Sequence, residues 1–162
     1  MRILGVDPGI GRCGWAIIEE SKGSFSAIAF DCIETSSKTD VSKRLEEVYL
    51  EMQRIIKKYS PDSLSIEDLF FTNNAKTAFV VGQARGVILL AASQNNLSIG
   101  IYTPLQVKMA VTGYGRAEKN QIGQMVKTIF KLKEAPKLDD TADALAVALT
   151  HGFSAKINKL SK

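Results

Sequence analysis

Five acidic residues of the chain lie next to apolar segments, where solvent-exposed charges are not usually found. Asp7 ends a short apolar run, ILGVD, and Glu67 ends another, SLSIE. Asp139, Asp140 and Asp143 gather at the start of an Ala- and Leu-rich segment near the C-terminus. Most other acids alternate with Lys and Arg, as on the exposed face of a helix. These five acids are therefore the first candidates for chemistry.

Some of these positions have simple structural explanations. An Asp before Pro-Gly is a common turn residue, which accounts for Asp7. An acid at a helix N-terminus is usually a cap or a partner of the helix dipole, which accounts for Asp139 or Asp140. Asp143 and Glu67 are harder to explain in this way, because both lie beside residues expected in the core.

Carboxylates brought together repel one another, and burial raises their pKa values further. Divalent cations resolve this conflict, and Mg²⁺ prefers carboxylate, water and phosphate oxygens. Two such ions about 4 Å apart activate water, hold a scissile phosphate and stabilise the leaving oxygen. The chain has one His and two Cys without close spacing, which argues against a structural zinc site. The acids therefore predict metal-dependent hydrolysis of a phosphodiester.

Composition bounds the class of protein. The chain has 162 residues, 45% of them hydrophobic, which suits one domain with a proper core. The net charge of +4 favours a polyanionic partner, and more so if several acids bind metal. No apolar run reaches the ~18 residues of a membrane span, and the N-terminus does not resemble a signal peptide. We expect a cytoplasmic protein with free thiols, no membrane contact, one domain over residues 1–155 and a flexible basic tail over 156–162.

Hydrophobic periodicity predicts the elements that must position the acids. Three strands joined by short turns indicate an antiparallel meander, and strands that alternate with helices follow it. This order predicts an α/β fold with a mixed five-stranded sheet, in which strands 4 and 5 are parallel and helices cover both faces. The expected strands are residues 3–7, 14–19, 25–33, 63–67 and 98–103. The expected helices are residues 41–59, 75–95, 104–113 and 117–132, and a last one from 139 or 140.

The motifs VDPG, SIED, GQARG, AEK and DTADALAVALTH, in this order and at these separations, resemble the RuvC family of Holliday junction resolvases. The resemblance runs from residue 2 to about residue 152. It implies a ribonuclease-H-like fold and a homodimer that binds a four-way DNA junction. It further implies paired nicks in strands of like polarity during recombination and repair, with two Mg²⁺ ions (or Mn²⁺) per site. The RuvA–RuvB branch-migration complex is the partner that the resemblance implies.

The resemblance also assigns roles to the acids. Asp7 and Glu67 match the first two metal-binding acids of the family, and Asp140 and Asp143 match the pair in its DxxD pattern. The neighbouring Asp139 offers a second register, which general chemistry does not exclude. The DTADAL match favours Asp140.

Four further residues are implied in DNA contact. Lys108 and Lys119 match basic positions that the family uses near DNA, and Arg116 fits a phosphate contact. Phe70 is implied to stack on a base opened at the junction, with Phe71 packed instead in the protein. The dimer contact is expected on the helix that carries Gly82 and Gly86.

Three other functions fit part of the pattern. An ATP-binding module of the actin or sugar-kinase type also has DxG near its first strand, but normally needs two such domains. A related ribonuclease-H-like nuclease acting on structured RNA or flaps would share the acids. A junction-binding module without activity would not need all of them.

Overall fold

The computed structural model describes the backbone of residues 1–68 and 75–160. Its five strands are β1 (Arg2–Asp7), β2 (Arg12–Ser21), β3 (Ser24–Glu34), β4 (Ser63–Glu67) and β5 (Ser98–Tyr102). Its helices are α1 (Val41–Tyr59), α2 (Ala75–Gln94), α3 (Pro104–Thr112), α4 (Lys119–Ile129) and α5 (Asp139–Leu160). The predicted order of strands and helices is confirmed. Phe70 and Phe71 lie outside the described residues.

The sheet has the strand order β3-β2-β1-β4-β5. β1 pairs antiparallel with β2 and parallel with β4, and β4 pairs parallel with β5. Val6 lies opposite Ile66, so the next residues, Asp7 and Glu67, end neighbouring parallel strands at the same edge of the sheet. The predicted mixed sheet is therefore confirmed, and its topology brings the first two acids together.

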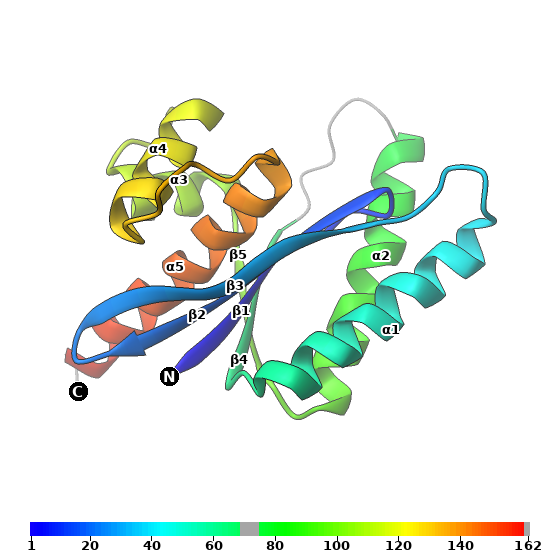
Figure 1. The fold of residues 1–162 in the computed structure, drawn as a ribbon, viewed down its shortest axis with the longest axis horizontal. Helices are drawn as coiled ribbons and strands as arrows, with labels where there is room; N and C mark the ends of the chain where they lie inside the picture. The colour runs from blue at the N-terminus through cyan, green and yellow to red at the C-terminus, as the bar shows by residue number, and fades with distance from the viewer. Residues whose placement is uncertain (69–74, 161–162) are drawn as a thin grey trace.

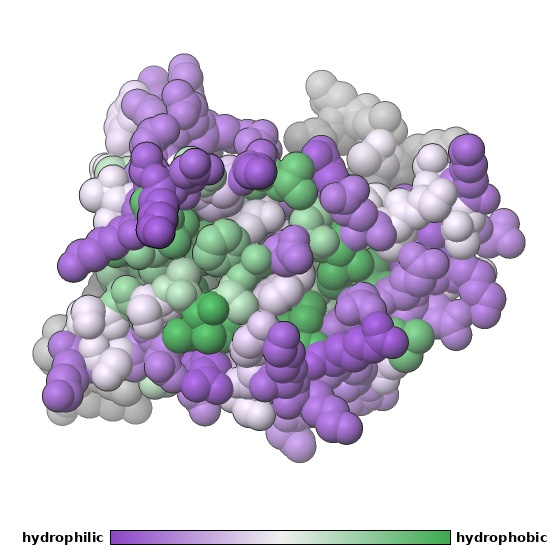
Figure 2. Space-filling model, viewed as in Figure 1, coloured by the Kyte–Doolittle hydropathy of each residue, from purple (hydrophilic) through white to green (hydrophobic). Residues whose placement is uncertain are grey.

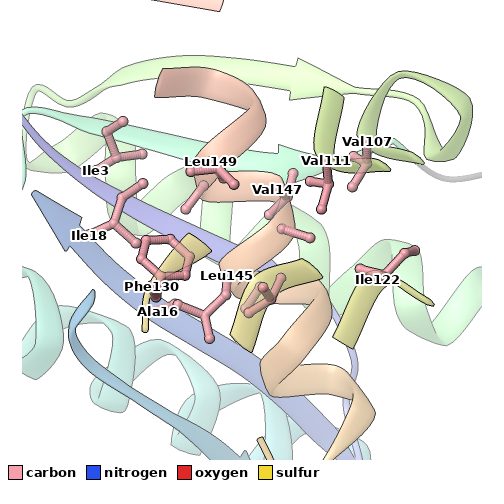
Figure 3. Packing of buried hydrophobic residues seen from close by; sticks show 14 residues of the cluster. Ile3, Ala16, Ile18, Val107, Val111, Ile122, Phe130, Leu145, Val147 and Leu149 are labelled. Carbon is pink, nitrogen blue, oxygen red and sulfur yellow. The ribbon is translucent and has the colours of Figure 1, made fainter. Parts of the chain in front are cut away.

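Helices cover both faces of the sheet, as predicted (Figure 1). α1 and α2 pack on one face over a cluster that includes Leu4, Ile17 and Ile66. On the other face, α5 lies against β1 and β2, and α3 and α4 pack on α5. Figure 3 shows this second cluster, in which Leu145, Val147 and Leu149 of α5 lie among side chains of the sheet and of α3 and α4. The helix that carries Asp140 and Asp143 is thus held by core packing on both sides.

Two glycines let α5 approach the sheet closely. A Cβ atom added at Gly5 would lie 2.2 Å from the carbonyl oxygen of Ala144, and one added at Gly14 would lie 2.0 Å from that of Asp140. Real Cβ atoms do not tolerate such contacts, so a side chain at either position would push the helix outward. The two glycines set how near the acids of α5 come to Asp7.

Several helix boundaries differ from the prediction: α2 and α3 each end one residue earlier, and α4 ends at Ile129 rather than residue 132. α4 begins at Lys119, not residue 117, because the Glu118 backbone N–H donates to the Gln121 side chain at 2.8 Å and marks the start. α5 continues to Leu160, so helical backbone extends beyond residue 155. The division of the chain into a domain and a flexible tail stays a prediction.

Over the described ranges, 1–68 and 75–160, no helix is long and apolar enough to span a membrane. Figure 2 shows apolar surface in the middle of the face on which β3 lies, between hydrophilic surfaces over α1 and over α3 and α4. Ile28 and Phe30 of β3 are among the exposed apolar side chains of the chain.

Candidate functional site

A pocket of about 240 Å³ opens at the edge of the sheet where β1 and β4 end. Three of the four predicted metal-binding acids line it, one each from β1, β4 and α5, and two of the predicted basic residues lie at its wall. The lining residues are Asp7, Glu67, Asp143, Lys108, Lys119, Pro104, Val107, Ile122 and Val147. The structure thus gathers five of the eight predicted site residues around one pocket.

Asp140, the fourth predicted acid, lies beside this pocket. Its carboxylate is 23% exposed and forms an ion pair with Arg12 at 3.4 Å. The paired oxygen, Oδ2, is buried and accepts no hydrogen bond from the described residues. Asp140 raises the pKa of Asp7, whereas Asp139, which is exposed, acts on Asp143 and Lys119. Of the two adjacent acids, Asp140 is therefore the one whose charge acts on Asp7.

Burial and mutual repulsion perturb the acids strongly. Burial, and after it the charges of the nearby Asp143, Glu67 and Asp140 carboxylates, together raise the pKa of Asp7 to about 8. Burial, followed by the charge of Asp143, raises the pKa of Glu67 to about 7. Burial also raises the pKa of Asp143, although Lys119 opposes the shift. Such values mark carboxylates that need a cation before all of them can ionise.

The two lysines differ in position. Lys119 is the first residue of α4, and its Nζ lies 3.4 Å from Asp143 Oδ2, while its side chain stays 70% exposed. The Asp143 charge raises the pKa of Lys119, so this amine remains protonated. Lys108 of α3 faces the same pocket and lowers the pKa of Glu67. Both lysines can reach the pocket and a polyanion outside it.

Arg116, another predicted DNA contact, does not line this pocket. It is exposed in the segment between α3 and α4. Phe70 lies outside the described residues. The roles predicted for both stay predictions.

Arg12 is a site residue that sequence reasoning did not select. It opens β2, and Asp7 pairs with Gly14 in the β1–β2 hairpin, so the hairpin places Arg12 at the edge where the acids lie. Its ion pair with Asp140 ties the hairpin to the start of α5. The signal in the sequence is the short DPGIGR turn, because the two strands that flank it must end at the same edge.

The residues fit a divalent cation by donor type. Mg²⁺ takes carboxylate oxygens, and Asp140 Oδ2, which pairs with Arg12 and accepts no hydrogen bond from the described residues, is a donor atom of this kind. Within the part of the chain that the structure describes, no three Asp, Glu, His or Cys side chains are already arranged to hold an ion. Lys119 and Arg12 pair with Asp143 and Asp140 of α5, so a cation that binds these carboxylates competes with the two basic side chains.

The pKa values predict how stability depends on pH in the presence of EDTA. A carboxyl whose pKa is higher in the folded chain favours folding at low pH, and this contribution is lost as the pH rises through the folded pKa. For Asp7 the pKa rises from 3.8 to about 8, and for Glu67 from 4.5 to about 7. The midpoint of thermal unfolding should therefore fall as the pH rises from about 4 to about 8.

Circular dichroism melts across this range test the prediction. Asp7→Asn should flatten most of the slope, because it removes the most strongly shifted carboxyl, whereas Asp139→Asn should change the slope much less, because Asp139 acts on Asp143 and not on Asp7. A wild-type midpoint that does not decline over this range would contradict the assignment of these shifts to the acid cluster.

Comparisons of the chain with known proteins point to one family. The family model described as crossover junction endodeoxyribonuclease RuvC matches residues 3–151. A protein of that name from Caldicellulosiruptor saccharolyticus is 56% identical over 95% of this chain and 93% of its own length. Another from Halothermothrix orenii is 52% identical over 98% of this chain and 96% of its own length.

Solved structures show the same relationship. The Thermus thermophilus RuvC structure superposes with a TM-score of 0.90 at 34% identity, over 98% of this chain and 97% of that one. The same protein in complex with a Holliday junction substrate superposes with a TM-score of 0.92 at 32% identity, over 98% of this chain and 96% of that one. The predicted ribonuclease-H-like fold is confirmed by these structures, and the chain belongs to the RuvC family of crossover junction endodeoxyribonucleases.

Proposed function

We propose that the chain resolves Holliday junctions by metal-assisted hydrolysis at the pocket that Asp7, Glu67 and Asp143 line, with Asp140 at its side. The observation that carries this proposal is the convergence of four acids from three elements on one sheet edge, next to two lysines. Membership of the RuvC family and the likeness to a RuvC bound to a Holliday junction substrate support the choice of substrate.

The four acids would hold two divalent ions, Mg²⁺ or in its place Mn²⁺. When bound, such ions activate water and neutralise charge on the scissile phosphate and the leaving oxygen. Asp7 is central, because the charges of all three other acids act on it. With a pKa of about 8 it is largely protonated at neutral pH, so it must release a proton as it becomes a ligand.

Lys119 and Lys108 would bind the DNA backbone beside the acids. The Lys119 amine is held near the cluster by Asp143 but remains exposed, so it can move from this carboxylate to a phosphate. There it would offset the negative charge that develops as the phosphodiester is cleaved. The buried Val107 and Ile122 form an apolar part of the pocket wall, which strengthens charge interactions next to them.

A two-fold homodimer would match the approximate two-fold symmetry of a junction and allow paired cuts. The predicted contact on α2 gains support from its exposed apolar side chains, Phe79 and Leu90. A Cβ atom added at Gly86 would meet nothing within 4 Å, so this part of α2 is open. Stacking by Phe70, a phosphate contact by Arg116, action with RuvA–RuvB and a cytoplasmic location belong to the same proposal.

A strand-resolved nicking assay on a synthetic immobile junction tests the function. We expect two symmetric nicks in strands of like polarity, dependent on Mg²⁺ and abolished by EDTA. A linear duplex, a flap and a structured RNA of matched length are the controls. Faster cleavage of the RNA or the flap would favour the related nuclease, and tight junction binding without any nick would favour a binding module.

A further inference from the structure

We infer that Ser65 is a positioning residue for the metal-binding acids, because its hydroxyl ties the strand of Glu67 to the helix of Asp143. The inference rests on the proposed function, since it concerns how the same acids are held. Ser65 Oγ donates a hydrogen bond to the Val147 carbonyl oxygen at 2.7 Å, and both residues are buried.

The two ends of this hydrogen bond lie next to the site along the chain. Ser65 precedes Glu67 by two residues on β4, so both side chains point to the same face of the sheet. Val147 follows Asp143 by about one turn of α5 and itself lines the pocket. The hydrogen bond therefore holds α5 at a fixed position along β4 and in a fixed rotation about the helix axis, one helical turn from Asp143.

The bond is not needed to satisfy the backbone. Val147 lies well inside α5, where a carbonyl oxygen already accepts from the N–H four residues later. The Val147 carbonyl oxygen therefore accepts one hydrogen bond from the helix backbone and a second from the Ser65 hydroxyl. Burying a hydroxyl group in a strand is less favourable for folding than burying the methyl group of alanine. The hydrogen bond of the hydroxyl offsets this cost, but the helix does not need it to form.

The neighbouring strand shows why a short side chain reaches the helix here. Gly5 of β1 is the register partner of Ser65, and a Cβ atom at Gly5 would lie 2.2 Å from the Ala144 carbonyl oxygen. On the other side, the register partner of Ser65 is Gly100 of β5, where a Cβ atom would lie 2.3 Å from the His151 ring. α5 therefore crosses the sheet over two glycines, and Ser65 stands between them as the side chain that bonds to the helix backbone.

Ser63 supplies an internal comparison on the same strand. It lies two residues before Ser65 and faces the same side, and it is 2% exposed. Its Oγ is buried and has no hydrogen-bond partner among the described residues. The same substitution at Ser63 and at Ser65 thus removes the same atom from the same strand, but only the second removes a link to α5.

The test compares Ser65→Ala with Ser63→Ala in the full chain. We expect Ser65→Ala to weaken Mn²⁺ binding without DNA by about tenfold, and to lower kcat at saturating junction by a similar factor with KM little changed. Mn²⁺ binding is measured by electron paramagnetic resonance of the free ion, and junction affinity by gel shift. Ser63→Ala should match the wild type in both, because its hydroxyl positions nothing.

Ser65→Cys keeps a weak donor of similar size and should fall between the wild type and Ser65→Ala, which guards against a variant that fails to fold. Equal Mn²⁺ affinity and kcat in Ser65→Ala and Ser63→Ala would overturn the inference, even if one variant melted earlier. If the wild type binds Mn²⁺ but nicks no junction, the proposed function fails, and the Mn²⁺ affinities alone still decide the role of Ser65. If the wild type binds no Mn²⁺, the inference fails together with the metal-assisted mechanism.

Discussion

Asp7→Asn should lower the rate of junction nicking by about 1000-fold or more, the largest loss that we expect from any single substitution in the chain. Asp7 is the acid on which the charges of Glu67, Asp140 and Asp143 all act. Asn keeps the size of the side chain and one oxygen, but it has no negative charge with which to hold a divalent ion. The expected loss is therefore in kcat, measured under single-turnover conditions with saturating enzyme.

Junction binding should survive this substitution. Asp7 is half-buried at the end of β1, while the exposed Arg116 and Lys119 side chains that would contact DNA remain in place. A neutral residue at position 7 also removes repulsion among the acids, so Asp7→Asn should melt at a higher temperature than the wild type in EDTA at pH 8. A gel shift without divalent metal and a thermal melt check the two expectations.

The result separates a catalytic role from a structural one. A structural Asp7 would give a variant that is less stable and loses binding and nicking together. A variant that nicks at more than a tenth of the wild-type rate would show that Asp7 is not essential for the reaction. The metal ions would then have to be held by other residues.

The sequence predicts the order of the elements well because the hydrophobic period changes clearly between strands and helices. α1 is an example: its buried residues Val48, Met52, Ile55 and Ile56 follow the three- and four-residue spacing that predicts it. The parallel pairing of β1 with β4, which the structure shows, then places Asp7 beside Glu67. For these elements, local pattern and topology suffice.

The sequence does not predict contacts that depend on how closely two elements approach. Arg12 pairs with Asp140 only because Gly14 lets α5 come near β2, and one sequence does not reveal that distance. Ser65 and Ser63 look alike in the sequence, and only the position of α5 distinguishes them. Tertiary packing, rather than residue type, decides each of these contacts.

The adjacent acids Asp139 and Asp140 should differ strongly in their effect on nicking. Asp140→Asn should lower nicking by about 100-fold or more, whereas Asp139→Asn should change it by less than about threefold. The difference follows from position on α5: Asp140 is one helical turn before Asp143 and acts on Asp7, while Asp139 is exposed.

Asp140 also has a ligand-like oxygen, since its Oδ2 is buried beside Arg12 and accepts no hydrogen bond within the described ranges. Each Asn variant removes one negative charge from the first turn of α5, so any general effect on the helix dipole or on DNA repulsion is shared by both. Single-turnover nicking and Mn²⁺ affinity in the absence of DNA, measured for both variants, then show which of the two acids is a metal ligand.

Normal cleavage by Asp140→Asn together with loss of cleavage by Asp139→Asn would move the metal-binding pair to Asp139 and Asp143. Because those two residues are four apart and also share a helix face, this outcome would leave the fold intact and rotate the site by one residue along α5.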